Sequence, residues 1–332
     1  MARIAIVGGG WGARVQEPTF REAGLEVVRA GRDDWRNVIA SREVDLVSIV
    51  TPPSEHREMA LAALAAGKHV LCEKPTALNA GEAAELVAAA HANRDRITLI
   101  DHELRFLPAW REARQRIASD IGRVRYAEVR YSSPARGDRS RGWNWWSDAS
   151  LGGGIWGAVG SHFVDALRYF GMKPEAAQAA LSTVIGERPY EGGTRAVTAD
   201  DCSSVQLRMR DGAMAILQFS VVSRGPDETS SMTIHGEEGA MRFAGEEVLL
   251  SQGGTPFERI AGGPLQDRPG NSHGGAYGTG TLHLAHALKA ALVDGDRSAL
   301  APAATFEDGL VQQRVLDAAR KSSARGGGWV AI

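Results

Sequence analysis

A glycine-rich turn near the start of the chain constrains the fold more than any other feature. The apolar run Ile4 to Val7 leads directly into residues 8–13, which read GGGWGA. A buried strand that passes through such glycines into a helix matches the G-x-G-x-x-A pattern of a dinucleotide-binding βα unit. Gly8 would allow the sharp turn, Gly10 would let the backbone approach a pyrophosphate, and Ala13 would allow close helix–strand packing. We therefore expect a cofactor site at Gly8, Gly10, Trp11 and Gly12, with a merely tight turn as the alternative.

Short aliphatic runs alternate with helix-length segments over the first hundred residues. The runs are Ile4–Val7, Leu25–Val28, Leu46–Val50, His69–Cys72 and Thr98–Ile100. Between them, apolar side chains recur at helical spacing, as in residues 60–65 and 83–90. This pattern predicts an N-terminal Rossmann-type doubly wound parallel sheet. Only residues 29–44 separate the second and third runs, which leaves room for one crossover of about 12 residues, so we expect the sheet to be shortened after the second strand.

The second half of the chain has a different pattern. Val205, Leu207 and Met209 alternate with polar residues, and Asp211-Gly212 then leads into a second apolar run, which predicts an antiparallel hairpin. Strands are also expected at 126–131 and 232–235, and covering helices at 159–170 and 310–319. We therefore predict a C-terminal α/β domain with an open, largely antiparallel mixed sheet. The expected domains are residues 1–120 for the dinucleotide and 121–332 for substrate binding and oligomerisation.

Composition excludes several classes of partner. The 38 basic and 40 acidic residues give a formal charge of −2, so no whole-chain attraction to nucleic acid or an anionic membrane is expected. Two distant cysteines and nine scattered histidines predict neither a disulfide framework nor a metal site. No signal-peptide core and no apolar stretch of about 18 residues is visible. We expect a cytoplasmic protein whose partner is a small molecule.

The end of the second strand bears on the choice between NAD and NADP. Residues 29–33 read RAGRD, without an acid directly at the strand tip. Arg32 or Arg29 would meet a 2′-phosphate, whereas Asp33 would take a ribose hydroxyl if the loop turned inward. The same charges would also suit a solvated surface. This segment tilts the expectation toward NADP, with NAD as the alternative.

Two further strand ends point at the same crevice, because ligands in open α/β sheets lie beyond the carboxyl ends of the strands. Residues Thr51, Pro52 and His56 follow the third strand and would flank the nicotinamide. Glu73 and Lys74 follow the fourth strand and are also expected to contact the cofactor. Lys74 is the candidate for proton transfer, since only five of the 38 basic residues are lysines. A partly desolvated lysine can release its proton near neutral pH, whereas arginine cannot. The alternative is an ordinary surface lysine.

Aromatic residues cluster before a second glycine run. Trp143, Trp145 and Trp146 lie within residues 142–148. Indole faces stack on the C–H surfaces of a sugar or cyclitol, so we expect these residues to bind substrate; a hydrophobic lid or a subunit contact is the alternative.

A histidine follows this cluster at the start of an amphipathic helix. His162 can orient a hydroxyl or pass a proton there, or it can simply cap the helix. Asp165, three residues on, is expected in the substrate site, where it would hold His162; the alternative is that it faces a domain interface. Arg105 is expected to complete the substrate pocket.

These motifs together resemble the glucose–fructose oxidoreductase, inositol dehydrogenase and MocA family of NAD(P)-dependent oxidoreductases. The resemblance rests on residues 8–12 (GGGWG), 73–75 (EKP), 105–108 (RFLP), 152–154 (GGG) and 160–162 (GSH), and it extends weakly to residues 303–310 and Trp329. It implies a nucleotide domain plus an α/β domain whose open sheet often builds homodimers or homotetramers. It also implies that Lys74 acts beside the nicotinamide and the substrate hydroxyl, with His162 across the pocket.

The chain departs from the family pattern at one position. Many members place an aspartate four residues before the histidine, where this chain has Ala158. The lysine–aspartate–histidine relay is therefore incomplete. We still predict an NAD(P)-dependent dehydrogenase or reductase that transfers hydride to or from a sugar, cyclitol or related polyol or keto compound. The alternatives are a non-catalytic sugar- or nucleotide-binding protein, and a lyase or epimerase that uses the cofactor transiently.

Overall fold

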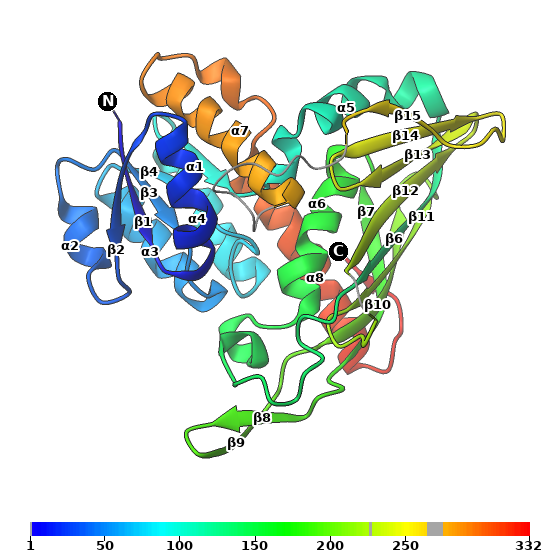
Figure 1. Cartoon of the computed structure of the whole chain (residues 1–332), viewed down its shortest axis with the longest axis horizontal. Coiled ribbons are helices and arrows are strands. Elements are labelled where there is room, and N and C mark those ends of the chain that lie inside the picture. Colours follow the sequence, from blue (N-terminus) through cyan, green and yellow to red (C-terminus); the bar gives the residue numbers. More distant parts are fainter. Residues whose placement is uncertain (1, 226–227, 264–274) are drawn as a thin grey trace. The chain divides into compact units, whose positions relative to one another are not determined.

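The computed structural model describes residues 2–225, 228–263 and 275–332 (Figure 1). The chain forms two compact units. One comprises the described residues of Met1–Arg111 and Leu265–Val311, and the other those of Glu112–Pro264 and Gln312–Ile332. The expected boundary at 120/121 lies near the first change of unit. The return of residues 275–311 to the first unit was not expected, and it occurs because helix α7 (Gly275–Leu292) supplies apolar side chains to that unit's core.

The first unit contains a six-stranded sheet in the order β16-β5-β4-β3-β1-β2. All neighbouring strands are parallel except β16, which pairs antiparallel with β5. The predicted doubly wound parallel sheet is confirmed. Its strands are β1 (Arg3–Val7), β2 (Glu26–Ala30), β3 (Leu46–Ile49), β4 (His69–Cys72), β5 (Thr98–Ile100) and β16 (Ala304–Thr305).

The predicted shortening after the second strand is also confirmed. A single six-residue helix, α2 (Trp35–Ala40), joins β2 to β3, and β3 pairs directly with β1. The remaining helical segments of this unit are η1 (Gly12–Gln16), α1 (Glu17–Glu22), α3 (Pro53–Ala65), α4 (Ala80–Ala92), η2 (Glu103–Phe106), α7 (Gly275–Leu292) and η6 (Arg297–Leu300).

Helices bury both faces of this sheet. On one face, Ile39, Leu64 and Leu86 of α2, α3 and α4 pack on alternate strand residues. On the other face, Phe20 of α1 and Leu288 of α7 pack on the intervening strand residues. Strands covered on both sides require continuous apolar sequence, which is why the short aliphatic runs were recognisable.

The second unit contains a nine-stranded sheet in the order β15-β14-β13-β12-β6-β11-β10-β7-β17 (Figure 1). Among its described strands, only β6 and β11 pair in parallel, so the predicted mixed, largely antiparallel sheet is confirmed. The strands are β6 (Val124–Ser132), β7 (Pro174–Ser182), β10 (Cys202–Met209), β11 (Met214–Ser220), β12 (Thr229–Gly236), β13 (Gly239–Ala244), β14 (Glu247–Gln252), β15 (Glu258–Ala261) and β17 (Val330–Ala331).

One face of this sheet carries its core. Ala215, Leu217 and Phe219 of β11 are buried, whereas Ile216 and Gln218 on the opposite face stay partly or fully exposed. Phe219 lies against aromatic residues that precede and begin α6 (Ser161–Tyr169), with ring centroids 5.6–6.0 Å apart. The alternation of apolar and polar residues along the predicted hairpin reflects this one-sided burial.

Shorter elements complete the second unit. A separate hairpin pairs β8 (Glu187–Tyr190) with β9 (Gly193–Ala196). The helical segments are η3 (Trp145–Ser147), η4 (Ala149–Leu151) and η5 (Trp156–Gly160). The chain passes between the two units within α5 (Pro108–Ile121) and α8 (Phe306–Ala324).

Within the described parts of the chain, no helix is both long enough and apolar enough to cross a bilayer. The same residues contain no group of three or more His, Cys, Asp and Glu side chains arranged to hold a metal ion.

Candidate cofactor and catalytic site

The glycine turn after β1 has the geometry that its sequence predicts. Gly8 has φ +117°, and a Cβ atom there would lie 2.2 Å from the carbonyl oxygen of Val50. Gly10 has φ +43°, and a Cβ atom at Gly9 or Gly10 would meet no other heavy atom within 4 Å. The backbone is therefore open on the side of Gly9 and Gly10 and closed against the sheet at Gly8. This arrangement fits a backbone cradle for a pyrophosphate.

The sequence pattern predicts close helix–strand packing at Ala13, but the structure places this contact at Gly12. A Cβ atom at Gly12 would lie 2.7 Å from Cγ2 of Ile6, whereas Ala13 is only partly buried. The helix has a π turn over Gly12–Gln16, which changes the residue that faces the strand. Trp11 lies partly buried in the first turn, where the positive end of the helix dipole favours an anion.

Two arginines lie at the end of β2. Arg32 is exposed and pairs with Glu55, with 3.2 Å between its Nε and a carboxylate oxygen. Arg29 donates to the carbonyl oxygen of Gly8 at 3.3 Å and lies 3.6 Å from a carboxylate oxygen of Glu17. Each cation thus already has a carboxylate neighbour at the edge where the adenosine half of a dinucleotide was expected.

His56 lies beneath the loops rather than on their surface. It is fully buried in α3, and its ring nitrogens lie 2.9 Å from the carbonyl oxygen of Thr51 and 3.0 Å from that of Pro75. Burial lowers the pKa of His56 to about 4, so the ring is neutral at pH 7. His56 thus lies between the loop after β3 and the loop after β4, and its neutral ring can donate to one of these two carbonyl oxygens. The predicted cofactor residues Thr51 and Pro52 lie in the first of these loops.

Glu73 and Lys74 directly follow β4 at the carboxyl edge of the sheet. Both are partly buried. The Glu73 side chain accepts a hydrogen bond from the backbone N–H of Lys74 at 3.3 Å and another from the Gln16 amide at 3.4 Å. The peptide bond from Lys74 to Pro75 is cis. Lys74 therefore lies where the sequence predicted it, with a carboxyl group as its immediate neighbour.

A cluster of buried acids beside Lys74 was not predicted. Asp101 follows β5, and Glu103 lies two residues further on in η2; both are buried. Burial raises the pKa of Asp101 to about 6 and that of Glu73 to about 8, and it raises the pKa of Glu103 well above its usual range. The rule that placed Glu73 at a strand end applies equally to Asp101, so this signal was available in the sequence.

Arg105, which is predicted to contact substrate, lies in the first unit. Its guanidinium lies 3.2 Å from a carboxylate oxygen of Asp308 and 3.4 Å from the carbonyl oxygen of Ala303, and it is buried. The structure thus shows Arg105 joining η2 to the segment that contains β16. Contact with substrate stays a prediction.

His162 and Asp165 lie in the second unit, both buried in α6 and spaced so that they share one side of the helix. The π turn of η5 leads into this helix and contains Ala158, the position of the missing acid. A Cβ atom at Gly160 would lie 2.4 Å from the Trp156 ring, so the glycine before the helix is required by this indole.

The glycine run before η5 is held in place by a carboxylate from a distant part of the sequence, Asp200. Asp200 accepts the backbone N–H of Trp156 at 2.8 Å, and a Cβ atom at Gly154 would lie 2.2 Å from an Asp200 carboxylate oxygen. Burial raises the pKa of Asp200 to about 6. Asp200 therefore positions the segment that carries His162.

The three predicted tryptophans have different surroundings. Trp143 packs against Tyr190, with ring centroids 5.4 Å apart, and under the guanidinium of Arg195 at 3.7 Å. Trp145 and Trp146 pack on each other at 5.8 Å. The structure thus shows Trp143 packed on the β8–β9 hairpin and the other two within η3.

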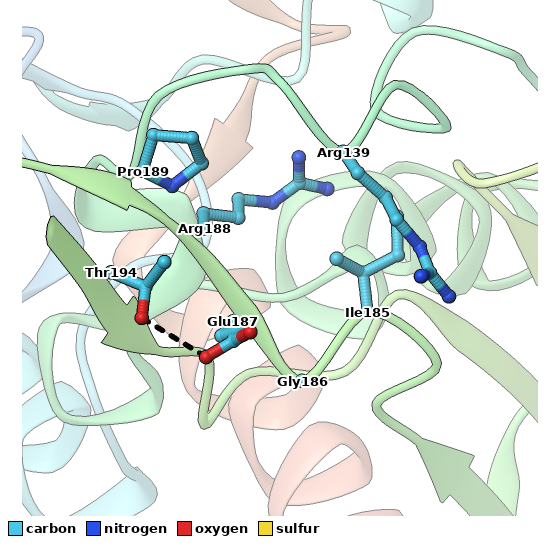
Figure 2. A pocket seen from close by; sticks show the side chains of 7 residues that line it. All are labelled: Arg139, Ile185, Gly186, Glu187, Arg188, Pro189 and Thr194. Carbon is cyan, nitrogen blue, oxygen red and sulfur yellow. Dashed lines mark hydrogen bonds between the residues drawn. The ribbon is translucent and has the colours of Figure 1, made fainter.

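A pocket of about 260 Å³ adjoins the β8–β9 hairpin (Figure 2). Figure 2 shows Glu187 and Thr194 on one side and Arg188 and Arg139 on the other. The Thr194 hydroxyl donates a hydrogen bond to a Glu187 carboxylate oxygen at 3.0 Å. Arg188 is buried and donates to the carbonyl oxygens of Arg136 and Asp138. These hydrogen bonds tie the hairpin to the loop that leads to the tryptophans.

Comparison with known proteins identifies relatives over almost the whole chain. Residues 13–100 match the description "Oxidoreductase family, NAD-binding Rossmann fold", and residues 110–242 match "GFO/IDH/MocA C-terminal domain". The chain is 31% identical over 330 residues to glucose-fructose oxidoreductase domain-containing protein 2 of Xenopus laevis, covering 94% of this chain and 83% of that protein. The chain belongs to the Gfo/Idh/MocA family of oxidoreductases.

Further Gfo/Idh/MocA relatives include sugar dehydrogenases. Levoglucosan dehydrogenase of Pseudarthrobacter phenanthrenivorans is 27% identical over 319 residues, covering 87% of this chain and 82% of that protein. A solved structure of levoglucosan dehydrogenase with NADH and L-sorbose has a TM-score of 0.83 at 25% identity, covering 100% of this chain and 98% of that one. An oxidoreductase domain protein from Kribbella flavida has a TM-score of 0.84 at 26% identity, covering 100% and 99%.

Membership of the Gfo/Idh/MocA family makes this chain an oxidoreductase-family protein with an NAD-binding Rossmann domain. The roles of Lys74, His162 and the tryptophans remain predictions, each now attached to a defined local structure.

Proposed function

We propose that this chain is an NAD(P)-dependent dehydrogenase or reductase that acts on a CH–OH or C=O carbon of a sugar, cyclitol or related polyol. One observation carries the proposal. The first unit places an open glycine turn and a partly buried lysine at the carboxyl edge of the same parallel sheet. Ligands of such sheets lie at that edge, so a cofactor held at the turn would extend toward the lysine.

The open backbone at Gly9 and Gly10 supports cofactor binding, because it offers amide groups at the positive end of a helix. Thr51 and Pro52, held from below by His56, would flank the nicotinamide. A bound nicotinamide supplies or accepts the hydride. The chain's own task is to hold the reactants close together and to move one proton.

We assign that proton to Lys74. In the reductive direction, the Lys74 ammonium gives a proton to the oxygen while the carbonyl carbon is reduced; in the oxidative direction, the neutral amine removes the proton from the hydroxyl. His162 is assigned the orientation of the same oxygen, with Asp165 beside it on α6.

The substrate class rests on the tryptophans and on the relatives. Levoglucosan dehydrogenase has been solved with NADH and L-sorbose, and its fold matches this chain. Trp143, Trp145 and Trp146 would supply flat apolar faces for a sugar ring. Arg105 is proposed to reach the same substrate.

The proposal also includes a preference for NADP, a cytoplasmic location and a homo-oligomeric state. Arg32 favours NADP, since Glu55 can release it to a 2′-phosphate, and NAD is the alternative. We further propose a cytoplasmic homodimer or homotetramer that uses the exposed face of the second sheet.

A steady-state assay with NADH and NADPH against keto-sugars and cyclitol ketones tests the function. Wild-type protein should oxidise one cofactor with at least one substrate, and Lys74→Ala should lose at least about a hundredfold in kcat. Lys173→Ala, which removes an exposed lysine of the second unit, is the matched control. A Lys74→Ala protein with full activity would refute the role of Lys74.

Ala158 favours a second candidate function. Without the acid at this position, the chain would use the cofactor transiently, oxidising and then re-reducing one substrate so that the net reaction is an elimination or an epimerisation. Product formation without a net change in nicotinamide absorbance would support this candidate over a simple dehydrogenase. Calorimetric binding of sugar with no conversion of any substrate would instead indicate a binding protein.

A further inference from the structure

Two carboxyl groups beside Lys74 share one hydrogen-bond donor. Glu73 and Asp101 each follow a strand directly, and their strands are neighbours, with Cys72 opposite Ile100. The Gln16 amide nitrogen lies 2.8 Å from a carboxylate oxygen of Asp101 and 3.4 Å from one of Glu73. The two acids are therefore brought to one point from two parallel strands.

The orientation of the Gln16 amide is set from its other side. The Ser48 hydroxyl donates to the Gln16 side-chain oxygen at 2.6 Å, so the amide nitrogen is turned toward the two acids. Gln16, Ser48 and Asp101 are all fully buried, which excludes water from one side of the pair. Besides this amide, only the Lys74 backbone N–H is shown donating to the pair, to Glu73 at 3.3 Å, and two such donors are too few to offset two full negative charges in such a place.

The surrounding groups favour one proton on the pair. Glu103 adds a third acid, which is itself buried, and Lys74 is the cation that stabilises the charged forms of all three. The neighbouring Cys72 thiol is neutral because burial raises its pKa. His56, which Lys74 also influences, is neutral at pH 7. Two carboxylates in contact within a low-dielectric site cannot both ionise readily.

We propose that Glu73 and Asp101 hold one proton between them and act through Lys74 as its proton store, replacing the carboxylate that is absent at Ala158. The inference rests on the proposed function, because it concerns the proton that Lys74 gives to substrate. Glu73 and Asp101 are positioning residues in this scheme, since neither is assigned contact with substrate.

The proton balance is simple. When the carbonyl carbon is reduced, its oxygen takes a proton from the Lys74 ammonium, which becomes a neutral amine. The amine then takes the shared proton from the pair, and the pair regains one proton from water. Oxidation runs the same steps backward, with the pair receiving the proton that Lys74 removes from the hydroxyl. Lys74 is thus recharged without an acid from the second unit.

The variants Asp101→Asn and Glu73→Gln test whether Glu73 and Asp101 share a proton that recharges Lys74. Each amide is neutral and can donate a hydrogen bond to the remaining carboxylate, as a protonated acid does, so both variants should fold. Asp95→Asn and Glu58→Gln change exposed acids of the same unit and serve as matched controls. If one test variant fails to fold by circular dichroism, the other decides.

The first measurement does not need activity. Infrared spectra should show a protonated-carboxyl C=O band in wild type that is lost as the pH rises through about 8. Each test variant should lack one such carboxyl at neutral pH compared with its control, because the remaining acid no longer faces a like charge. Burial is the largest cause of the raised Glu103 pKa and is the same in every sample, so the Glu103 carboxyl is a common background at neutral pH. An unchanged band in both variants would overturn the shared proton.

The second measurement is the pH profile of kcat. In the test variants, the alkaline limb should move to lower pH by about one unit or more, with KM nearly unchanged. A merely structural role would lower kcat at every pH without moving the limb. If wild type is active and both variants keep its profile, the store is refuted while the proposed function stands. If wild type converts no substrate, the proposed function fails and the infrared measurement still decides the proton sharing.

Discussion

The amide nitrogen of Gln16 lies 2.8 Å from a carboxylate oxygen of Asp101, in a buried hydrogen bond. This bond joins the helix that follows the glycine turn to the carboxyl end of β5. The cradle for a cofactor and the acids beside Lys74 are therefore parts of one hydrogen-bonded structure. A substitution in the cradle should therefore alter the acids beside Lys74, and a substitution at these acids should alter cofactor binding.

Gln16→Met should destabilise the protein by about 2 kcal/mol, because it leaves the buried Asp101 carboxyl without its donor. The loss should be greater above pH 6, where more of Asp101 is ionised. Urea unfolding at two pH values measures both effects. Gln218→Met, on an exposed strand position, is the control, and an equal loss in the two variants would contradict the prediction.

Gly8→Ala and Gly9→Ala should separate folding from cofactor binding. Alanine at Gly8 is strained at φ +117° and collides with the Val50 carbonyl, so the unfolding free energy should fall by about 3 kcal/mol or more. Alanine at Gly9 meets nothing in the protein and should leave the melting temperature unchanged, yet it should weaken cofactor binding by filling the cradle. Thermal unfolding and NADH fluorescence titration measure the two effects. Equal behaviour of the two variants would argue against a cradle at this turn.

Titration of Asp200 should lower the free energy of unfolding as the pH rises. Its folded-state pKa of about 6 lies above the ordinary aspartate value of about 3.9, so the folded chain binds more protons between these pH values. Its contribution is complete below about pH 4 and is lost as the pH rises toward about 6, at up to about 1.4 kcal/mol per pH unit.

Asp200→Asn keeps an acceptor for the Trp156 N–H and removes this titration. Relative to wild type, the variant should therefore gain stability across that pH window and show a constant difference above it. Chemical unfolding at a series of pH values checks this, with the exposed Asp294→Asn as the control. Parallel curves for wild type and Asp200→Asn would disprove it.

Arg32→Ser should weaken NADPH binding at least about tenfold and leave NADH binding nearly unchanged, because only NADPH offers a 2′-phosphate. Glu55→Gln should have the opposite effect on NADPH, since it releases Arg32 from its ion pair. Fluorescence titration at one ionic strength measures both. Arg36→Ser removes a similarly exposed arginine paired with Glu58, and it should change neither affinity. Equal losses for both cofactors would count against NADP.

Much of the architecture was predictable because it depends on the local periodicity of apolar and polar residues. The five aliphatic runs of the first half all became strands, and the alternation around Asp211-Gly212 became the hairpin of β10 and β11. The scarcity of lysine and the position after β4 were enough to single out Lys74. Each inference used only neighbours within a few residues, where side-chain periodicity reports directly on burial.

The closest contacts were less accessible from the sequence. Ala13 was expected to face β1, but the π turn places Gly12 there, and such a turn has no recognised local signal. Arg105 is predicted to contact substrate, and nothing in the local sequence indicates its partner Asp308, which is 203 residues away.

The order of residues along this chain determined its strands, its glycine turn and the two kinds of sheet, because helix and strand periodicities act over short distances. The tertiary structure alone decided that residues 275–311 complete the first unit and that Gln16 meets Asp101 across 85 residues. It also decided that Glu73 and Asp101 share one donor. Such pairings depend on which strands become neighbours, and that choice is made by the packing of the whole core.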